Sequence, residues 1–253
     1  MDNLYKQIAQ MIFTKRPCVV LSGAGISAES GIPTFHSKGG LWDKYDPALY
    51  ASIEVFNRDP SRYWSIRGEF IRKYNELKPN PAHTAIANLE KSGFISQVIT
   101  QNIDGLHKKA GSLNVIEMHG SLREIFCLAC RREYLAPEVP EGMPPLCQCG
   151  GVLKPNTVLF GEPLPPVALE SAYQAAMTCG SMLVIGTSAV VYPAAALPGL
   201  AKQHGAFIVE INIEKAFADA DAVIQEKAGI ALPLLAAQIK ALADMRIEEG
   251  KLS

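Results

Sequence analysis

The sequence predicts an α/β fold, in which a doubly wound parallel sheet carries a small module built around a cysteine cluster. Three observations support this class. Short apolar runs alternate with helical patterns, a glycine-rich turn follows the first such run, and the cysteines cluster in mid-chain. The chain has 253 residues, of which 48% are hydrophobic and 19% are charged. This length and composition suit one large packed domain with a smaller inserted module.

The predicted strands are short β-branched and apolar runs that end in glycine or in polar residues. In chain order they cover residues 17–22, 94–102, 114–120, 181–188, 206–212 and 220–225. The predicted helices have apolar side chains three or four residues apart and stop at glycine or proline. They cover residues 1–15, 60–77, 82–93, 193–205 and 231–247. After the first strand, Gly31 and Pro33 end a short helical start, and a loop rich in Gly, Asp and Pro follows.

The overall charge is close to zero, with a formal net charge of −1 and a sequence pI of about 6.5. Such a balance argues against bulk electrostatic binding to nucleic acid or to an anionic membrane. The N-terminal residues lack the pattern of a secretory signal, and no apolar run approaches the roughly 18 residues of a membrane span. We therefore expect a cytoplasmic protein with no membrane or direct nucleic-acid partner. The oligomeric state is left open.

The glycine-rich turn, Gly23 to Ala28, reads Gly-Ala-Gly-Ile-Ser-Ala and matches the dinucleotide fingerprint G-x-G-x-x-G/A. Gly23 and Gly25 would let the backbone approach a pyrophosphate, and the helix start would point N–H groups at it. An ordinary tight turn is the alternative. Asp43 and Asp46 have the spacing of a ribose-binding carboxylate but lie in a loop, so the hydride-transfer pattern is incomplete. The turn therefore favours a domain that binds a dinucleotide.

The cysteine cluster has the spacing C-x2-C, a gap of sixteen residues, then C-x-C followed by two glycines. Its members are Cys127, Cys130, Cys147 and Cys149. Four thiolates suit a closed, structural zinc site, and in a cytosolic chain such a cluster favours metal over disulfides. Free thiols are the alternative. A nucleic-acid-binding zinc ribbon is disfavoured, because the intervening segment is not a basic face with aromatic residues.

Polar residues follow several predicted strands, at the edge of the sheet where open α/β proteins bind ligands. After two of the strands they are Gln101, Asn102, Asp104, His107 and His119. After two later strands they are Gly186, Thr187, Ser188 and Asn212. His119 is a candidate general base because imidazole titrates near neutral pH. A loop histidine with satisfied hydrogen bonds is the alternative for His119, and ordinary strand ends are the alternative for the second set.

The joint order of these motifs resembles the sirtuin family of NAD-dependent protein-lysine deacylases. The matching segments are GAGISAESGIPTF, TQNIDGLHKKAG, MHGSL, the four cysteines, VLFGE, GTSAVVYPA and EIN, and they run through nearly the whole chain. The resemblance implies a Rossmann-like domain of residues 1–35, 83–122 and 156–253. It also implies a cofactor loop and helical module of residues 36–82 and a zinc-binding module of residues 123–155. NAD and an acyl-lysine peptide would bind between the two domains.

The implied reaction transfers the acetyl group of acetyl-lysine to ADP-ribose and releases nicotinamide and O-acetyl-ADP-ribose. His119 would be the general base that activates a ribose hydroxyl, and Asn102 and Asp104 would complete the catalytic set. The implied NAD-binding residues are Gly23, Ala24, Gly25, Ala28, Phe35, His36, Gln101, Asn102, Ile103, Asp104, Gly186, Thr187, Ser188 and Asn212. Residues that would flank the peptide are Val158, Phe160, Gly161, Glu162, Val190, Val191 and Tyr192. Zinc would be structural.

The chain departs from the family pattern at two places. Many sirtuins have an arginine where this chain has His36, and a histidine is not always charged. Sirtuins that prefer succinyl or malonyl groups carry a Tyr-x-x-Arg pair, and Arg67 and Phe70 occupy those positions here. We therefore expect an acetyl or other neutral acyl group. Two interpretations of Arg67 stay open: an arginine supplied in a shifted register, or an ordinary side chain on a solvated helix face.

The sequence leaves other functions open. They are deacylation of other acyl groups, mono-ADP-ribosyl transfer on the same scaffold, a non-catalytic binding module and a dehydrogenase. His119, Asn102 and Asp104 argue against a mere binding module, and the incomplete ribose-binding pattern argues against a dehydrogenase.

Overall fold

The computed structural model describes residues 2–32, 51–72, 76–248 and 250. Its main body is a six-stranded sheet in the order β3-β2-β1-β7-β8-β9, and every neighbouring pair is parallel. The strands are β1 (Cys18–Ser22), β2 (Ile95–Thr100), β3 (Val115–Glu117), β7 (Ser181–Ile185), β8 (Phe207–Asn212) and β9 (Ala222–Gln225). The strand order reverses between β1 and β7, which is the doubly wound arrangement and its ligand-binding switch point. The predicted fold class is confirmed.

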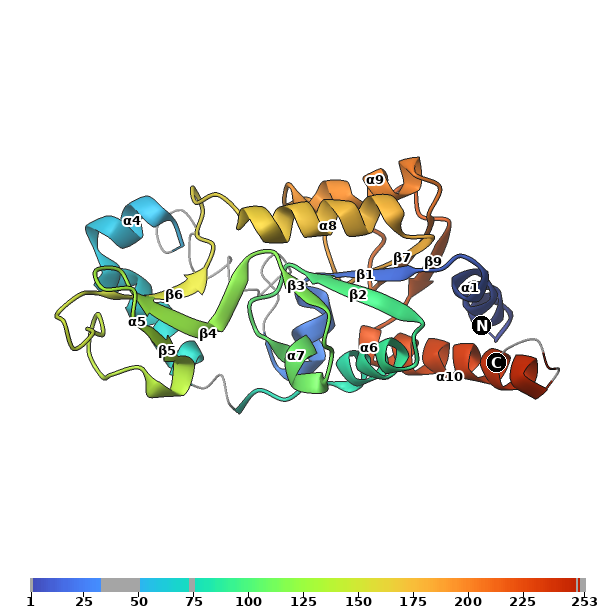
Figure 1. Ribbon diagram of the computed structural model, residues 1–253, viewed down its shortest axis with the longest axis horizontal. Coiled ribbons are helices and arrows are strands. Elements are labelled where there is room, and N and C mark those ends of the chain that lie inside the picture. Colours follow the sequence, from blue (N-terminus) through green and yellow to red (C-terminus); the bar gives the residue numbers. More distant parts are fainter. Residues whose placement is uncertain (1, 33–50, 73–75, 249, 251–253) are drawn as a thin grey trace.

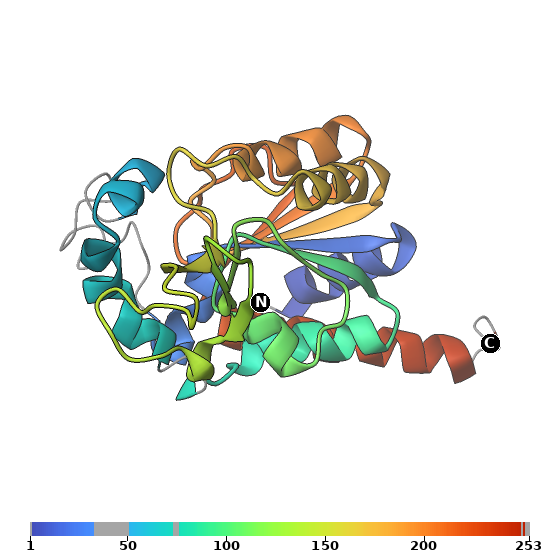
Figure 2. The ribbon, with the colours of Figure 1, turned by 60° about the vertical axis from the view of Figure 1, so that its left-hand side comes forward.

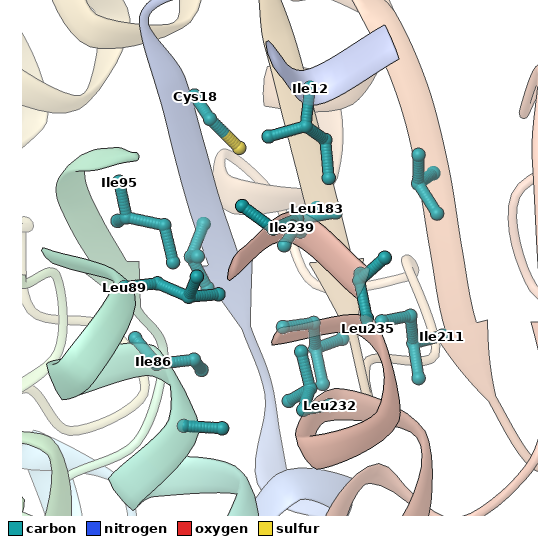
Figure 3. Close-up of a cluster of buried hydrophobic side chains, with 14 of the residues drawn as sticks. Ile12, Cys18, Ile86, Leu89, Ile95, Leu183, Ile211, Leu232, Leu235 and Ile239 are labelled. Atoms are coloured by element: carbon teal, nitrogen blue, oxygen red, sulfur yellow. The ribbon is translucent and has the colours of Figure 1, made fainter. Parts of the chain in front are cut away.

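Helices cover both faces of this sheet (Figure 1). One face carries α1 (Asp2–Thr14), α6 (Pro81–Lys91) and α10 (Ala228–Glu248), and the other carries α8 (Pro166–Thr178) and α9 (Leu197–Gln203). Figure 3 shows the core on the α10 side, where Leu183 and Ile211 of the sheet meet Leu232, Leu235 and Ile239 of the helix. All of these side chains are fully buried, so this layer provides much of the hydrophobic stabilisation.

Helix α10 is long and apolar enough to cross a membrane by length and composition, although no such run was expected from the sequence. It packs along α1 and α6. Its residues Ala231, Leu232, Leu235 and Ile239 lie in the core, and 33% of its most apolar window is buried, so packing against the protein accounts for one face of the helix.

A second, smaller module lies to one side of the main sheet (Figure 2). In the described part of the chain it contains a three-stranded antiparallel sheet in the order β5-β4-β6 and two α-helices. The elements are β4 (Gly120–Cys127), β5 (Glu133–Leu135), β6 (Leu153–Thr157), α4 (Ile53–Arg58) and α5 (Pro60–Arg72). The Trp64 indole N–H donates to the Leu153 carbonyl at 2.9 Å, which joins the helices to the sheet. The module has its own core around Phe56, Trp64 and Leu122.

Several elements of the structure were not expected from the sequence. The buried residues of helix α8 are Ala172, Ala175 and Ala176, while Leu169 and Tyr173 pack against the core only partly buried, so its buried face lacks the large apolar side chains that mark a helical period. Strand β4 has an irregular register between Ser121 and Ile125, which breaks the period-two pattern of a strand. Helix α4 is only one and a half turns long. Among the described residues there are four further short helices: η1 (Ala24–Ser30), α7 (Leu106–Ala110), η3 (Ala136–Glu138) and η4 (Ala194–Ala196).

The domain limits inferred from the resemblance stay a prediction. Strand β4 begins before the predicted start of the zinc module, and β6 ends after its predicted end. Most of the expected cofactor loop, including Phe35 and His36, lies outside the described residues.

Candidate active site

A cleft of about 1190 Å³ opens at the carboxyl ends of β1, β2, β7 and β8 and extends to the small module. Residues from distant motifs line it together, and those predicted to bind NAD are Gly23, Ala24, Gly25, Ala28, Gln101, Asn102, Ile103, Gly186, Thr187, Ser188 and Asn212. His119 lines the same cleft. The sheet therefore gathers the glycine-rich turn and the polar strand ends in one place, as the parallel topology requires.

The glycine-rich turn packs directly against a second turn after β7. The Gly25 N–H donates to the Gly186 carbonyl at 2.8 Å. A Cβ atom at Gly25 would lie 2.7 Å from the Gly186 Cα, and Gly186 has a φ of 57°. Steric contact between the two turns therefore explains why both positions are glycine, and it brings backbone from β1 and β7 to the floor of the cleft.

A buried hydrogen-bond network supports the wall of the cleft formed by Asn102. The Asn102 side-chain amide donates to the Gly23 carbonyl and to the Ser27 hydroxyl, both at 3.1 Å. Ser27 donates to Asp104 at 2.7 Å, and Asp104 also accepts the Leu106 N–H at 2.9 Å. Burial raises the pKa of Asp104, while its hydrogen bonds from Leu106 and Ser27 lower that pKa. Asp104 is therefore placed to orient Ser27 and, through it, the amide of Asn102.

Two histidines lie behind this network, with ring centroids 4.9 Å apart. Burial lowers the pKa of His83 to about 4, and burial together with the charge of His83 lowers the pKa of His107 to about 3. Both rings are therefore neutral near pH 7. Ser22 donates to Thr100, so His107 Nε2, 2.8 Å from the Ser22 hydroxyl, acts as the donor to it. His107, predicted at the cofactor side, is thus buried in the support of the cleft.

His83 is a member of this network that sequence reasoning did not single out. Its Nδ1 accepts the Asn80 N–H at 3.3 Å, which leaves Nε2 as the protonated nitrogen, 3.4 Å from the Ser27 hydroxyl. Asn80 caps α6 and also donates to the Ile26 carbonyl at 2.7 Å. The sequence predicts only a helix over residues 82–93 here, and the histidine at the third helical position after Asn-Pro is the signal that points to His83.

His119 lies between β3 and β4 and is the titratable group of the cleft with the geometry of a base. Its Nδ1 lies 2.8 Å from the Gln101 carbonyl oxygen. A carbonyl only accepts, so Nδ1 carries the proton and Nε2 is left as the basic nitrogen. Burial lowers the pKa of His119, and the bond to Gln101 partly raises that pKa, so the ring is neutral near pH 7.

Hydrogen bonds among Gln101, Thr187 and Asn212 fix the part of the cleft at the ends of β7 and β8. The Gln101 amide donates to the Thr187 hydroxyl, and the Asn212 amide donates to the Thr187 carbonyl, both at 3.0 Å. Glu210 is almost completely buried and accepts the backbone N–H groups of Ala216 and Phe217. Sequence reasoning quoted Glu210 within a motif but gave it no role, and the structure places it as the anchor of the loop after β8.

The rim of the cleft next to the small module carries the predicted peptide-binding residues. Lining residues from this set are Val158, Phe160, Gly161, Glu162, Val191 and Tyr192. Phe160, Val190 and Tyr192 have exposed fractions of 52%, 61% and 75%, so this part of the rim presents several large apolar side chains to solvent. Tyr63 and Arg67 of α5 line the same region. Burial raises the pKa of Tyr63, and the nearby charge of Arg67 lowers it.

The four cysteines converge in the small module, with all sulfur atoms within 4.8 Å of one another. The closest pairs, Cys127 with Cys149 and Cys130 with Cys147, are 3.5 and 3.6 Å apart. Two thiolates that share a tetrahedral zinc at about 2.3 Å would be about 3.8 Å apart, so the set fits zinc. A Cβ atom at Gly151 would lie 2.6 Å from the Cys127 sulfur, which explains a glycine after the C-x-C pair. None of the cysteines lines the cleft, as expected for a structural site.

Comparison with known proteins agrees with this geometry. Residues 23–193 match the Sir2 family, and the chain belongs to that family. The NAD-dependent protein deacylase 2 of Pyrobaculum aerophilum is 48% identical over 239 residues, which cover 92% of this chain and 95% of that protein. The expected sirtuin resemblance is confirmed.

Two solved structures are similar over almost their whole length. A Sir2 homolog–NAD complex has a TM-score of 0.86 and 40% identity, and the match covers 94% of each chain. A Sir2 variant with a deacetylated p53 peptide and 3'-O-acetyl ADP-ribose has a TM-score of 0.86 and 35% identity, covering 98% of this chain and 99% of that one.

Proposed function

We propose that this protein is an NAD-dependent protein-lysine deacetylase, which transfers the acetyl group of acetyl-lysine to ADP-ribose. The products are free lysine, nicotinamide and O-acetyl-ADP-ribose. The observation that carries the proposal is the position of His119. His119, with Nε2 as its basic nitrogen, lines the same cleft as the glycine-rich turn and the apolar residues of the rim. Membership of the Sir2 family supports the same activity.

The glycine turns at residues 23–25 and 186 would receive the diphosphate of NAD, because their backbones approach closely without side chains. Asn102, held by Ser27 and Gly23, would position the nicotinamide end of the ribose. With the C1′–nicotinamide bond placed beside the acyl oxygen, that oxygen attacks C1′ and nicotinamide leaves.

His119 would then take the proton of a ribose hydroxyl, and the freed oxygen attacks the acyl carbon. Addition of water and loss of the amine complete the transfer, which leaves the acetyl group on ADP-ribose. A neutral His119 is ready to accept that proton near pH 7, because burial holds its pKa below the usual value. The hydrogen bond from Nδ1 to Gln101 stabilises the imidazolium that forms.

The peptide would lie along the rim formed by residues 158–162 and 190–192, where the side chains of Phe160 and Tyr192 are exposed. Backbone pairing of an extended peptide with these two segments would be a form of β-augmentation. This mode reads the peptide backbone rather than its sequence, so we propose broad acceptance of acyl-lysine proteins.

Arg67 favours a second candidate substrate, an acyl group that ends in a carboxylate. It lines the cleft, and its charge acts on Tyr63, which supports an arginine near the acyl end despite the shifted register. Guanidinium groups bind carboxylates in bidentate fashion. Acetyl remains the preferred group in our proposal, and Arg67 makes a succinyl or malonyl group the first alternative to test.

The test is a panel of acetyl, succinyl and long-chain acyl peptides with NAD, followed by nicotinamide release and by mass spectrometry of the ADP-ribose product. Acetyl peptide should give O-acetyl-ADP-ribose in a 1:1 ratio with nicotinamide. If Arg67→Leu removed activity on succinyl but not acetyl peptide, a carboxylate pocket would be established. Transfer of ADP-ribose to protein without any acyl peptide would instead support mono-ADP-ribosyl transfer.

We also propose that zinc at the four cysteines is structural, and that the protein works in the cytoplasm without nucleic-acid or membrane partners. Four thiolates available for a metal suit a reducing compartment. Metal analysis of the purified protein and fractionation of cells that express it test the two statements separately.

A further inference from the structure

Lys154 on β6 is a buried cation with no role in the reaction described above. Only 4% of the residue is exposed, and lysines are rarely buried to this extent without a partner. Its Nζ lies 3.0 Å from Glu162 Oε2 and donates to the Thr157 carbonyl at 2.9 Å. A longer contact, at 3.4 Å, joins Nζ to the Pro155 carbonyl. The ammonium group is therefore fixed between its own strand and the chain that follows it.

The partner, Glu162, closes a tight turn on the rim of the cleft. Its carboxylate accepts the Leu159 N–H at 2.8 Å, and its own N–H donates to the Leu159 carbonyl at 2.9 Å. Gly161, the third residue of this turn, has a φ of 89°, as a type II turn requires. Phe160, the second residue, is half exposed and lines the cleft.

The pair also spans two parts of the molecule. Lys154 on β6 is directly opposite Phe126 on β4, and its Nζ is 5.7 Å from the Phe126 ring centroid. Phe126 immediately precedes Cys127 of the cysteine cluster. On the other side, the Phe160 backbone pairs with Ala51 and Ile53. The Lys154–Glu162 pair therefore ties the sheet that carries the metal site to the turn that presents Phe160.

We propose that Lys154 is a positioning residue for substrate peptide: its ion pair with Glu162 holds residues 159–162 in the shape that receives the peptide. The statement rests on the proposed function only in naming an acyl-lysine peptide as the occupant. Without the ammonium group, the Glu162 carboxylate would turn toward water and release the Leu159 N–H. The turn would then have to be ordered by the peptide, which weakens peptide binding. The glycine-rich turn is held by its hydrogen bond to Gly186 and not by the Lys154–Glu162 pair, so the affinity for NAD in the absence of peptide should not change.

The experiment compares Lys154→Met, which keeps the length without the charge, with Lys154→Arg, which keeps the charge. Lys202→Met is the matched control, because Lys202 pairs with Asp221 at 2.5 Å and neither residue lines the cleft. We expect Lys154→Met to raise the peptide KM about tenfold, with kcat at saturating peptide within about twofold. Lys154→Arg should recover most of the native KM, and Lys202→Met should leave it unchanged. The dissociation constant of NAD, measured by calorimetry without peptide, should be the same in all variants.

Hydrogen exchange provides a readout that does not depend on activity. In the peptide-free protein, the amides of Leu159 and Glu162 should exchange faster in Lys154→Met than in the native chain. Unchanged exchange or an unchanged peptide KM in Lys154→Met would overturn the inference. A variant that binds peptide and NAD more weakly and also melts at a lower temperature would overturn it too, because the effect would then be general destabilisation. Faster exchange in a protein that deacylates no peptide would instead refute the proposed function and leave the role of Lys154 in the turn intact. A Lys154→Met/Glu162→Gln double variant whose fold-change in KM equals the product of the two single fold-changes would also contradict the pair acting as a unit.

Discussion

Replacement of His119 tests the chemistry most directly, because two variants separate its two interactions. His119→Asn keeps a side-chain N–H that can reach the Gln101 carbonyl but cannot accept a proton near pH 7. His119→Ala loses both functions. Loss of a positioned general base lowers a rate by about 10²- to 10⁴-fold, or about 3 to 5 kcal/mol of transition-state stabilisation. The lost hydrogen bond to Gln101 contributes only about 1 kcal/mol to folding.

Steady-state kinetics on an acetyl-lysine peptide should therefore show a similar, large loss of kcat in both variants. Peptide and NAD affinities, measured by calorimetry, should stay within a few-fold, because the cleft wall is held by Asn102, Ser27 and Gly23 rather than by His119. In the native enzyme kcat/KM should fall as the pH drops through the pKa of His119, which burial places below the usual value of about 6.5. A kcat of His119→Asn close to the native value would refute the assignment of the base. A native kcat/KM that does not decrease at low pH would refute it as well.

Three further predictions concern stability. Gly120 has a φ of 73°, and a Cβ there would lie 1.9 Å from the Asn156 oxygen. Gly120→Ala should thus lower the free energy of unfolding, measured in urea, by about 2 to 5 kcal/mol. Gly205 has a similar φ but open space around it, so Gly205→Ala should lower the same free energy by only about 1 to 2 kcal/mol. Equal losses in the two variants would contradict the steric argument. Cys127→Ser should reduce zinc content and melting temperature together, and retention of both would refute the metal site. The pKa values of His83 and His107 are about 4 and about 3 in the folded protein against about 6.5 when unfolded, so the stability they contribute is present above pH 6.5 and lost as the pH falls toward 4. Urea unfolding at pH 7 and pH 5 should show this decrease, with a smaller one in His83→Gln; equal values in the native chain would contradict it.

Local patterns carried most of the fold prediction. Apolar strands, helical periods and their glycine stops are encoded within a few residues, so the parallel sheet was predictable. Helix α8 was missed because alanines give its buried face no contrast with the exposed one. Strand β4 was missed because its irregular register removes the alternation of a regular strand. In both cases the surface that packs against the element decides which residues are buried, and that surface forms only when the chain folds.

By itself the sequence determined the class of sheet, the glycine-rich turn, the cysteine spacing and the order of motifs that marks the Sir2 family, because each is a short pattern or a chain of such patterns. Only the tertiary structure decided which polar groups meet. It placed His119 on Gln101, buried His83 and His107 behind Ser27, and joined Lys154 to Glu162. Such contacts exist only after the strands have aligned. Hydrogen bonds and ion pairs act over a few ångströms, and the chain brings these atoms within that range only when it folds.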